Sequence, residues 1–208
     1  MDRQVTDIKL VKKHFSQHDP RILKVLQTVD LGEWFENSSS DDHFYNLTRN
    51  IIYQQLAGKA ASTIFGRFEA LVGGKVKPEK VVQFEDQAFR DVGLSWAKAK
   101  YVKDLAAKVI SKDVVLSNID TLDNESVITE LTKVKGIGRW TAEMFLLFTL
   151  HRENIFSYGD LGLRNGFAKL YGITDPTPTQ IKSIVDLWTP YESYGSISLW
   201  HHLDNRES

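Results

Sequence analysis

Hydrophobic residues recur every three or four positions along most of the chain, and this spacing predicts helices rather than strands. Between Asn46 and Leu71 the apolar positions fit helical stripes that are broken or bent near Ala57 and Gly58. The apolar positions are Leu47, Ile51, Leu56, Ile64, Phe68 and Leu71. Strict alternation of apolar and polar residues, which is typical of half-buried strands, is nearly absent. The pattern therefore predicts an all-α protein.

The same spacing predicts further helices in the second half of the chain. Two short helices are expected between Val81 and Ile110, joined at Gly93, and the second begins near Trp96. The segments SVITELTKV and TAEMFLLFTL are expected to form another pair of helices. Later helices are expected at residues 160–170, 179–187 and 196–202. The polar stretch ENSSSDD, residues 36–42, predicts a loop and a boundary between subdomains.

Composition narrows the class of protein without naming a function. The chain has 208 residues, of which 42% are hydrophobic and 25% charged, as in ordinary soluble globular proteins. Its formal net charge is −1, so a nucleic-acid-binding surface would have to be a local patch. The absence of cysteine excludes disulfides, thiolate zinc sites and cysteine-bound iron–sulfur clusters. No apolar run has the length of a membrane span or a signal peptide, so we expect an intracellular protein without membrane contact.

The stretch VKGIGRWTAEMF, residues 134–145, places two glycines directly before an amphipathic run. Each glycine would weaken a helix by about 1 kcal/mol relative to alanine, so both are expected in a turn. A helix that ends near Val134 and a new one from about Trp140 make this segment a helix–hairpin–helix. Amides exposed at the start of a helix suit a phosphate, whereas a plain connection with a glycine C-cap is an equal alternative. The nearby basic residues Lys133, Lys135 and Arg139 favour phosphate.

Asp160 directly precedes a predicted helix, about twenty positions after the hairpin. The commonest role for an aspartate at such a position is N-capping. Capping is compatible with catalysis, because the positive end of the helix dipole favours an ionised carboxylate. Such a carboxylate can stabilise positive charge in a reaction.

These segments together resemble a known family. LTKVKGIGRWTAEMFLLFTL followed by FSYGDLGLRNGF resembles the helix–hairpin–helix DNA glycosylase superfamily, and more narrowly the alkylbase glycosylases of the 3-methyladenine DNA glycosylase II type. IIYQQLAGKAASTIFGRF and GLSWAKAKYVKDLA are similar to two further segments of that family. The resemblance covers most of residues 46–171. It implies two helical subdomains with a DNA-binding cleft between them: residues 43–155 as the hairpin-bearing bundle, and residues 1–42 with 156–208 as the subdomain that carries Asp160.

The resemblance implies a monofunctional enzyme that flips alkylated purines such as 3-methyladenine and 7-methylguanine out of DNA and excises them in base excision repair. Asp160 would stabilise the positive sugar as the purine leaves and orient or deprotonate water. Gln55, with Leu56 beside it, would fill the gap in the stack, although an exposed helix face is the alternative for Gln54 and Gln55. Trp140 would offer its ring to an electron-poor base, and a core position is equally expected for it. It stands where strand-cleaving relatives carry a nucleophilic lysine.

Further contacts follow from the same resemblance. Phosphate binding is implied for the hairpin residues Gly136, Ile137, Gly138, Lys133, Lys135 and Arg139. The backbone carbonyls of Thr132, Val134 and Ile137 are expected to hold a structural Na⁺ or K⁺, and no other cofactor is expected. The implied partner is damaged double-stranded DNA, bound by a monomer, in the cytoplasm with the chromosome for a bacterial protein or in the nucleus for a eukaryotic one.

The chain departs from the family pattern at three positions. Lys135 stands where proline is common, Tyr158 where a small residue or proline is common, and Glu192 where arginine is usual. Two other functions therefore stay open: a damaged-DNA-binding protein without catalysis, and a glycosylase for deaminated or mismatched bases. Asp160 argues against the first, because a pure binder has no need of a carboxylate there.

Overall fold

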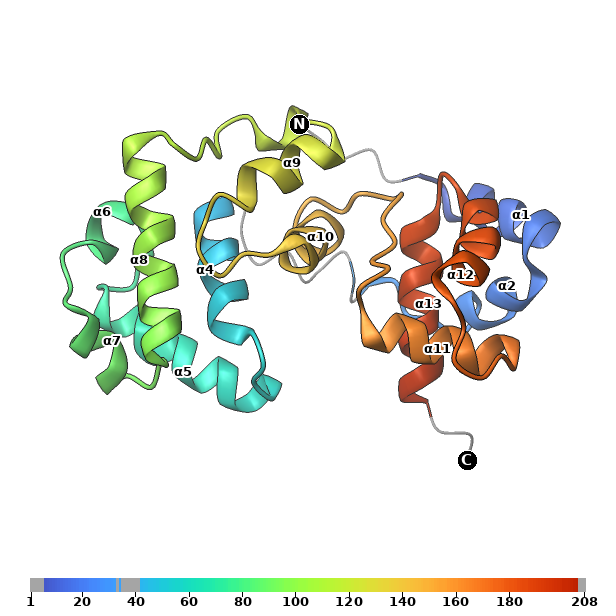
Figure 1. Ribbon diagram of the computed structural model, residues 1–208, viewed down its shortest axis with the longest axis horizontal. Helices are drawn as coiled ribbons and strands as arrows, with labels where there is room; N and C mark the ends of the chain where they lie inside the picture. Colours follow the sequence, from blue (N-terminus) through green and yellow to red (C-terminus); the bar gives the residue numbers. More distant parts are fainter. Residues whose placement is uncertain (1–5, 33, 35–41, 206–208) are drawn as a thin grey trace. The chain divides into compact units, whose positions relative to one another are not determined.

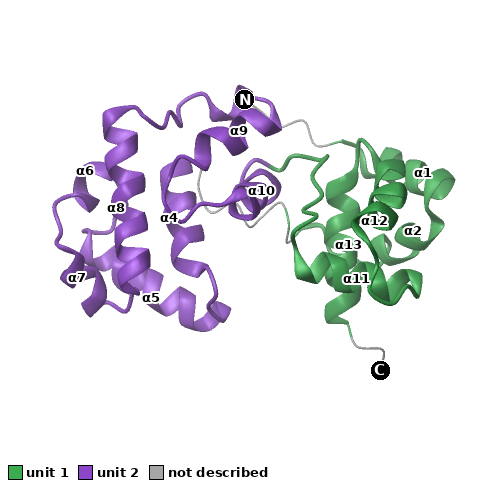
Figure 2. Ribbon diagram, viewed as in Figure 1, with its two compact units in different colours: residues 1–35, 151–208 green, residues 36–150 purple. Residues whose placement is uncertain are grey.

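The structure is a computed structural model that describes residues 6–32, 34 and 42–205. Every regular element in these residues is a helix, and none is a strand, which confirms the predicted all-α class (Figure 1). The chain forms two compact units, residues 36–150 and residues 1–35 with 151–208 (Figure 2). The boundaries at 43 and 155 expected from sequence lie a few residues further along. The loop predicted at 36–42 falls outside the described residues except for Asp42.

The unit of residues 36–150 is built around the long helix α8. Its helices are α4 (His43–Tyr53), α5 (Gly58–Leu71), α6 (Pro78–Val81), α7 (Asp86–Asp91), α8 (Trp96–Ser111), α9 (Asn124–Leu131) and α10 (Arg139–Phe148), with a 3₁₀ turn at Ile119–Thr121. Helices α4, α6 and α7 pack against α8, and α10 packs against both α4 and α9. Phe68 and Phe89 are fully buried, with ring centroids 5.5 Å apart. The interruption predicted near Ala57 is the turn of residues 54–57 between α4 and α5.

The second unit contains α1 (Ile8–His18), α2 (Pro20–Leu26), α11 (Leu161–Tyr171), α12 (Pro178–Val185), a 3₁₀ turn (Asp186–Trp188) and α13 (Glu192–Asp204). Helix α13 packs against α2 and α11. Its contact with α11 is very close, because a Cβ on Gly166 would lie 2.5 Å from the backbone oxygen of Leu199. The buried carboxylate of Asp19 caps α2 and accepts a hydrogen bond from Trp188 Nε1 at 2.8 Å. Tertiary contacts of this kind hold the short helices in place.

Two predicted helix boundaries are wrong. Helix α9 ends at Leu131 rather than near Val134, so the turn before α10 is longer than expected. Helix α13 begins at Glu192 rather than Ser196. Its first residues include serine and glycine, which are poor helix formers, but Gly195 lets the ring of Trp188 approach and Ser193 donates to the carbonyl of Arg152. Packing therefore overrides local propensity. No helix in the described part of the chain is long and apolar enough to cross a membrane.

Candidate functional site

The hairpin between α9 and α10 has the backbone that its glycines predict. Gly136 has φ +86°, and a Cβ there would lie 2.1 Å from the ring of Tyr101 on α8. Ile137 is 3% exposed and anchors the turn in the core. Gly138 is the N-cap of α10 with extended backbone, and an added Cβ would meet no atom within 4 Å. The start of α10 therefore carries no side-chain cap, and a side chain added at Gly138 would meet only open space.

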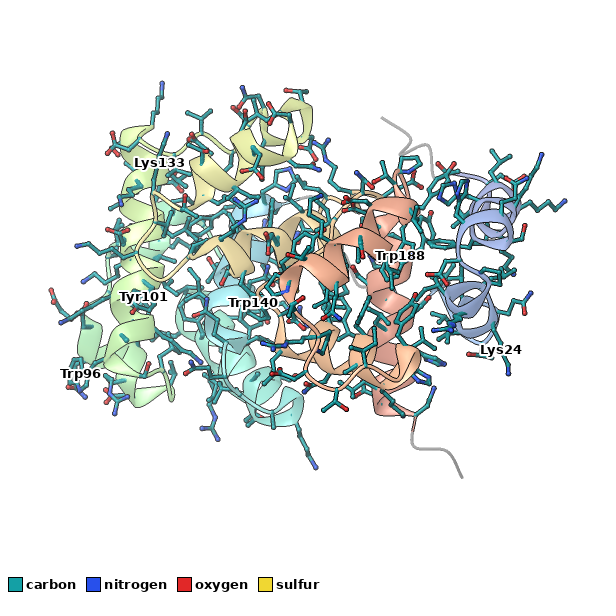
Figure 3. All side chains as sticks on the ribbon, turned by 45° about the vertical axis from the view of Figure 1, so that its right-hand side comes forward. Lys24, Trp96, Tyr101, Lys133, Trp140 and Trp188 are labelled. Carbon is teal, nitrogen blue, oxygen red and sulfur yellow. The ribbon has the colours of Figure 1, made fainter. Side chains whose placement is uncertain are left out.

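The basic side chains predicted beside the hairpin already have acidic partners. Arg139 donates to both carboxylate oxygens of Glu125, at 3.1 and 2.5 Å, and to Glu143 at 2.9 Å. This pairing lowers the pKa of Glu125 and raises that of Arg139. Lys133, which is labelled in Figure 3, has a carboxylate partner as well. Its Nζ lies 2.5 Å from an oxygen of Glu130. A phosphate would therefore have to compete with carboxylates for these two cations.

Lys135 helps to hold the hairpin turn in place through its backbone rather than its side chain. Its N–H donates to the carboxylate of Asp104 on α8 at 2.8 Å. Together with Tyr101, this contact fixes the hairpin turn to α8. Sequence spacing gives no signal for either contact, because the partners lie about thirty residues apart in the chain.

The turn between α4 and α5 carries Gln55 and Leu56, the residues predicted to fill the gap in the DNA stack, which we call the wedge residues. Gln55 is exposed and has φ +56°, and Leu56 is 38% exposed. Neither residue lies on a helix face, so the alternative interpretation for Gln55 is wrong. Gln54 is also in the turn, where its side-chain amide donates to the carbonyl of Gly136 at 3.0 Å and to Thr141 Oγ1 at 3.1 Å. The turn is thus joined to the hairpin.

A cavity of about 500 Å³ brings the wedge residues and Trp140 together. Trp140 is 44% exposed, so it is not a core residue. Residues of α4, the turn and α10 line the cavity: Asn46, Arg49, Asn50, Tyr53, Gln54, Gln55, Leu56, Trp140, Thr141, Met144, Phe148 and Thr149. The guanidinium carbon of Arg49 lies 4.2 Å from the ring centroid of Tyr53. Sequence reasoning missed these two residues, although their spacing of four places them on one face of a helix.

Asp160, in the other unit, is the N-cap of α11, as predicted. Its Oδ1 accepts hydrogen bonds from the N–H of Leu163 at 2.8 Å and from Trp200 Nε1 at 3.0 Å. Gly162 leaves room for this arrangement, because a Cβ there would lie 2.9 Å from Trp200 Nε1. The carboxylate is held in one orientation by groups that donate to its charged form. Trp200 has no sequence signal, since it lies forty residues further along the chain.

Two of the three residues that depart from the family pattern, Tyr158 and Glu192, have raised pKa values. Burial is the main cause in each case, and it raises the pKa of Tyr158 to about 12. The carboxylate of Glu192 adds to the shift of Tyr158, and that of Asp186 adds to both shifts. The hydroxyl of Thr189 donates to Glu192 at 3.2 Å. Burial at this position therefore makes the charged form of Glu192 less favourable than it is for an exposed glutamate.

The backbone carbonyls predicted to hold a monovalent cation, those of Thr132, Val134 and Ile137, belong to the segment between α9 and α10. The carbonyl of Val134 already accepts a hydrogen bond from the N–H of Ile137 at 3.1 Å. The ammonium of Lys108 donates to the neighbouring carbonyl of Lys133, so this turn already attracts positive charge. No cluster of three or more histidine, aspartate or glutamate side chains suited to a metal occurs in the described residues.

Comparison with known proteins gives one consistent family. The sequence model of the HhH-GPD superfamily base excision DNA repair protein matches residues 48–190. DNA-3-methyladenine glycosylase 1 of Schizosaccharomyces pombe is 31% identical, over 94% of this chain and 88% of that protein.

Solved structures agree with this result. A DNA-3-methyladenine glycosidase from Bacillus halodurans aligns with a TM-score of 0.80 and 35% identity, covering 93% of this chain and 88% of its own. A 3-methyladenine DNA glycosylase of S. pombe in complex with abasic DNA aligns with a TM-score of 0.74 and 29% identity, covering 91% of this chain and 94% of its own.

Proposed function

Because this chain belongs to the HhH-GPD superfamily of base excision DNA repair proteins, we infer that it is a monofunctional DNA glycosylase for alkylated purines. The relatives named above are 3-methyladenine glycosylases, and both solved chains match this one over more than nine-tenths of its length. The reaction is hydrolysis of the N-glycosidic bond of bases such as 3-methyladenine and 7-methylguanine. The observation that carries the proposal is the oriented carboxylate of Asp160.

Asp160 acts on the sugar in this proposal. An alkylated purine is already cationic and leaves without a general acid, while positive charge develops on the sugar. A fixed carboxylate stabilises that charge at no reorganisation cost, and it orients or deprotonates the attacking water. Leu163 N–H and Trp200 Nε1 both bond to Oδ1, so they set the direction of the carboxylate. Trp200 is thus a positioning residue.

The hairpin and the turn of residues 54–57, which we call the wedge turn, bind the DNA around the damaged nucleotide. The uncapped start of α10 and the cations Lys133, Lys135 and Arg139 bind phosphate, which positions the protein without reading sequence. A Na⁺ or K⁺ on the carbonyls of Thr132, Val134 and Ile137 would strengthen that phosphate contact. Gln55 and Leu56 fill the gap in the stack, and Trp140 stacks on the extruded base.

We expect the protein to act as a monomer on damaged double-stranded DNA. The cytoplasm with the chromosome is the expected compartment in a bacterium, and the nucleus in a eukaryote. Neither expectation affects the chemistry at Asp160.

One observation favours a second substrate class. The guanidinium of Arg49 lines the cavity with Trp140, and a fixed positive charge opposes the entry of a cationic base. Neutral lesions, such as deaminated purines, would not meet this repulsion. A binding protein without catalysis is disfavoured by Asp160.

The deciding experiment is base release. The protein is incubated with duplex DNA treated with a methylating agent and, separately, with duplex that contains hypoxanthine, and the released bases are identified by chromatography. A protein-free control corrects for spontaneous loss of alkylated purines. We expect release of 3-methyladenine and 7-methylguanine. Release of hypoxanthine alone would shift the assignment to neutral lesions, and release of no base would contradict a glycosylase.

A further inference from the structure

The ammonium group of Lys98 connects the wedge turn to α8. Lys98 Nζ donates to the carbonyl of Ile52 at 2.8 Å and to the carbonyl of Gln54 at 2.6 Å. These carbonyls lie at the C-terminal end of α4, where helix oxygens lack amide partners and a cation is favoured. Lys98 is half-buried, and this burial lowers its pKa. The two hydrogen bonds to carbonyls stabilise the charged form of Lys98 and offset the cost of its partial burial.

The same turn is joined to the hairpin by the side chain of Gln54. Its amide nitrogen donates to the carbonyl of Gly136 and to the hydroxyl of Thr141. Gln54 is therefore held at both ends, with its backbone oxygen on Lys98 and its side chain on the hairpin. These three hydrogen bonds connect three parts of one unit: α8, the wedge turn and the segment proposed to bind phosphate.

Gln55, next in the chain, has a conformation that needs such support. Its φ of +56° lies in the left-handed region, which few residues other than glycine adopt. A strained backbone persists only where the surroundings hold it. The side chain of Gln55 is exposed, so the support comes from its neighbours.

We propose that Lys98 and Gln54 are positioning residues that hold Gln55 and Leu56 ready for insertion into duplex DNA and tie this turn to the hairpin that binds phosphate. The role rests on the proposed glycosylase function. Lys98 and Gln54 act through Gln55 and Leu56. A hairpin seated on a phosphate then fixes where the wedge enters the stack, because the amide of Gln54 joins the two.

The role predicts an effect that depends on the DNA. A duplex with an abasic site offers a stacked gap for Gln55 and Leu56, whereas a single strand with the same abasic site offers none. Loss of the support should therefore weaken binding to the duplex and leave binding to the single strand nearly unchanged. A merely structural role would weaken both to the same extent.

The test measures dissociation constants for both DNAs with three variants. Lys98→Met removes the ammonium at similar length, and Gln54→Glu replaces the two donors with an acceptor that faces the Gly136 carbonyl. Lys100→Met is the matched control, because it removes a charge from an exposed position on the same helix. We expect the preference for the abasic duplex to fall about tenfold, or about 1.4 kcal/mol, in the first two variants and to stay unchanged in the control. Lys98→Arg, which keeps the charge and the donors, should restore most of the preference.

A double-mutant cycle with Gln55→Ala shows whether the residues act through the wedge. If Lys98 works through Gln55, the double variant loses no more preference than Gln55→Ala alone. Additive losses, or equal weakening on both DNAs, would overturn the proposal. These measurements use binding, so base release by the wild-type protein tests the glycosylase function separately. Thermal unfolding of each variant identifies one that does not fold, and if this is Lys98→Met, the Gln54→Glu variant decides the outcome.

Discussion

Asp160 combines a capping role with the proposed catalytic one, and its contacts allow the two to be separated. The amide of Leu163 and the indole nitrogen of Trp200 both donate to Oδ1. An asparagine offers the same acceptor and is an equally good N-cap, but it carries no charge. The cap depends on the oxygen, whereas the chemistry depends on the charge.

Asp160→Asn is therefore expected to fold normally and to lose activity. Without the carboxylate the positive sugar is not stabilised, and single-turnover release of 3-methyladenine should fall by at least about 100-fold. Thermal unfolding and binding to abasic DNA should both stay close to the wild type. A variant that releases base at a nearly normal rate would remove Asp160 from the mechanism.

Glu192 gives a pH-dependent prediction. Burial raises its pKa in the folded protein, partly opposed by the hydroxyl of Thr189 and the charge of Lys182 and increased by Asp186. The folded state therefore binds this proton more tightly than the unfolded chain. The corresponding stability is fully present below the unfolded pKa and is lost as pH rises through the folded pKa.

Glu192→Gln should abolish that loss, because glutamine stays neutral and can still accept from Thr189. We expect the Tm of the variant to exceed that of the wild type by a few degrees at pH 8 and to match it near pH 4. Calorimetry across this range measures the difference. A variant less stable than the wild type at pH 8 would show that the ionised carboxylate has a favourable partner.

At the scale of the elements, the two hairpin glycines have different roles although they flank the same isoleucine. Gly136 is required by the fold, through its positive φ and the ring of Tyr101. Gly138 has extended backbone and open space around it. Any need for glycine at 138 must come from a ligand that approaches the start of α10.

The glycine variants should therefore separate stability from binding. Gly136→Ala is expected to destabilise the protein by about 1–3 kcal/mol, because either the tyrosine or the turn must move. Gly138→Ala should leave the Tm unchanged but weaken binding to DNA of any sequence, because the added methyl group would crowd a phosphate that approaches the start of α10. Denaturant unfolding and DNA titration measure the two effects. Unchanged DNA affinity in Gly138→Ala would make the hairpin a simple connector.

At the scale of the whole molecule, the chemistry should end with an intact strand. A strand-cleaving glycosylase attacks the sugar with an amine and forms a Schiff base. Trp140 supplies no such amine, Lys133 is paired with Glu130, and Lys98 is bonded to two carbonyls. We therefore expect water to be the nucleophile and an abasic site to be the product.

Borohydride added during turnover should therefore trap no covalent protein–DNA adduct. The strand should break only after alkali or an added abasic-site endonuclease, as followed on a denaturing gel. A strand-cleaving glycosylase run in parallel shows that trapping works. An adduct that disappears when one lysine is mutated would reverse the monofunctional assignment.

The sequence by itself determined the features that depend on neighbouring residues. The three-to-four spacing indicates the helices, the break between α4 and α5 follows from the interrupted stripe, and Asp160 is recognisable as a cap because its helix follows at once. Gly136 likewise indicates a turn with positive φ, because glycine adopts that conformation without steric cost. Dihedral preferences and helical periodicity act over a few residues, so they can be read directly from the chain.

Only the tertiary structure decided which distant groups meet. The pairing of Arg139 with Glu125, the bonds from Gln54 to the hairpin and the indole of Trp200 on Asp160 join residues 14 to 87 positions apart. Helix α13 begins earlier than its serines and glycine predict, because Trp188 packs onto Gly195. Such contacts depend on how helices pack, and packing is a property of the whole unit rather than of any local pattern.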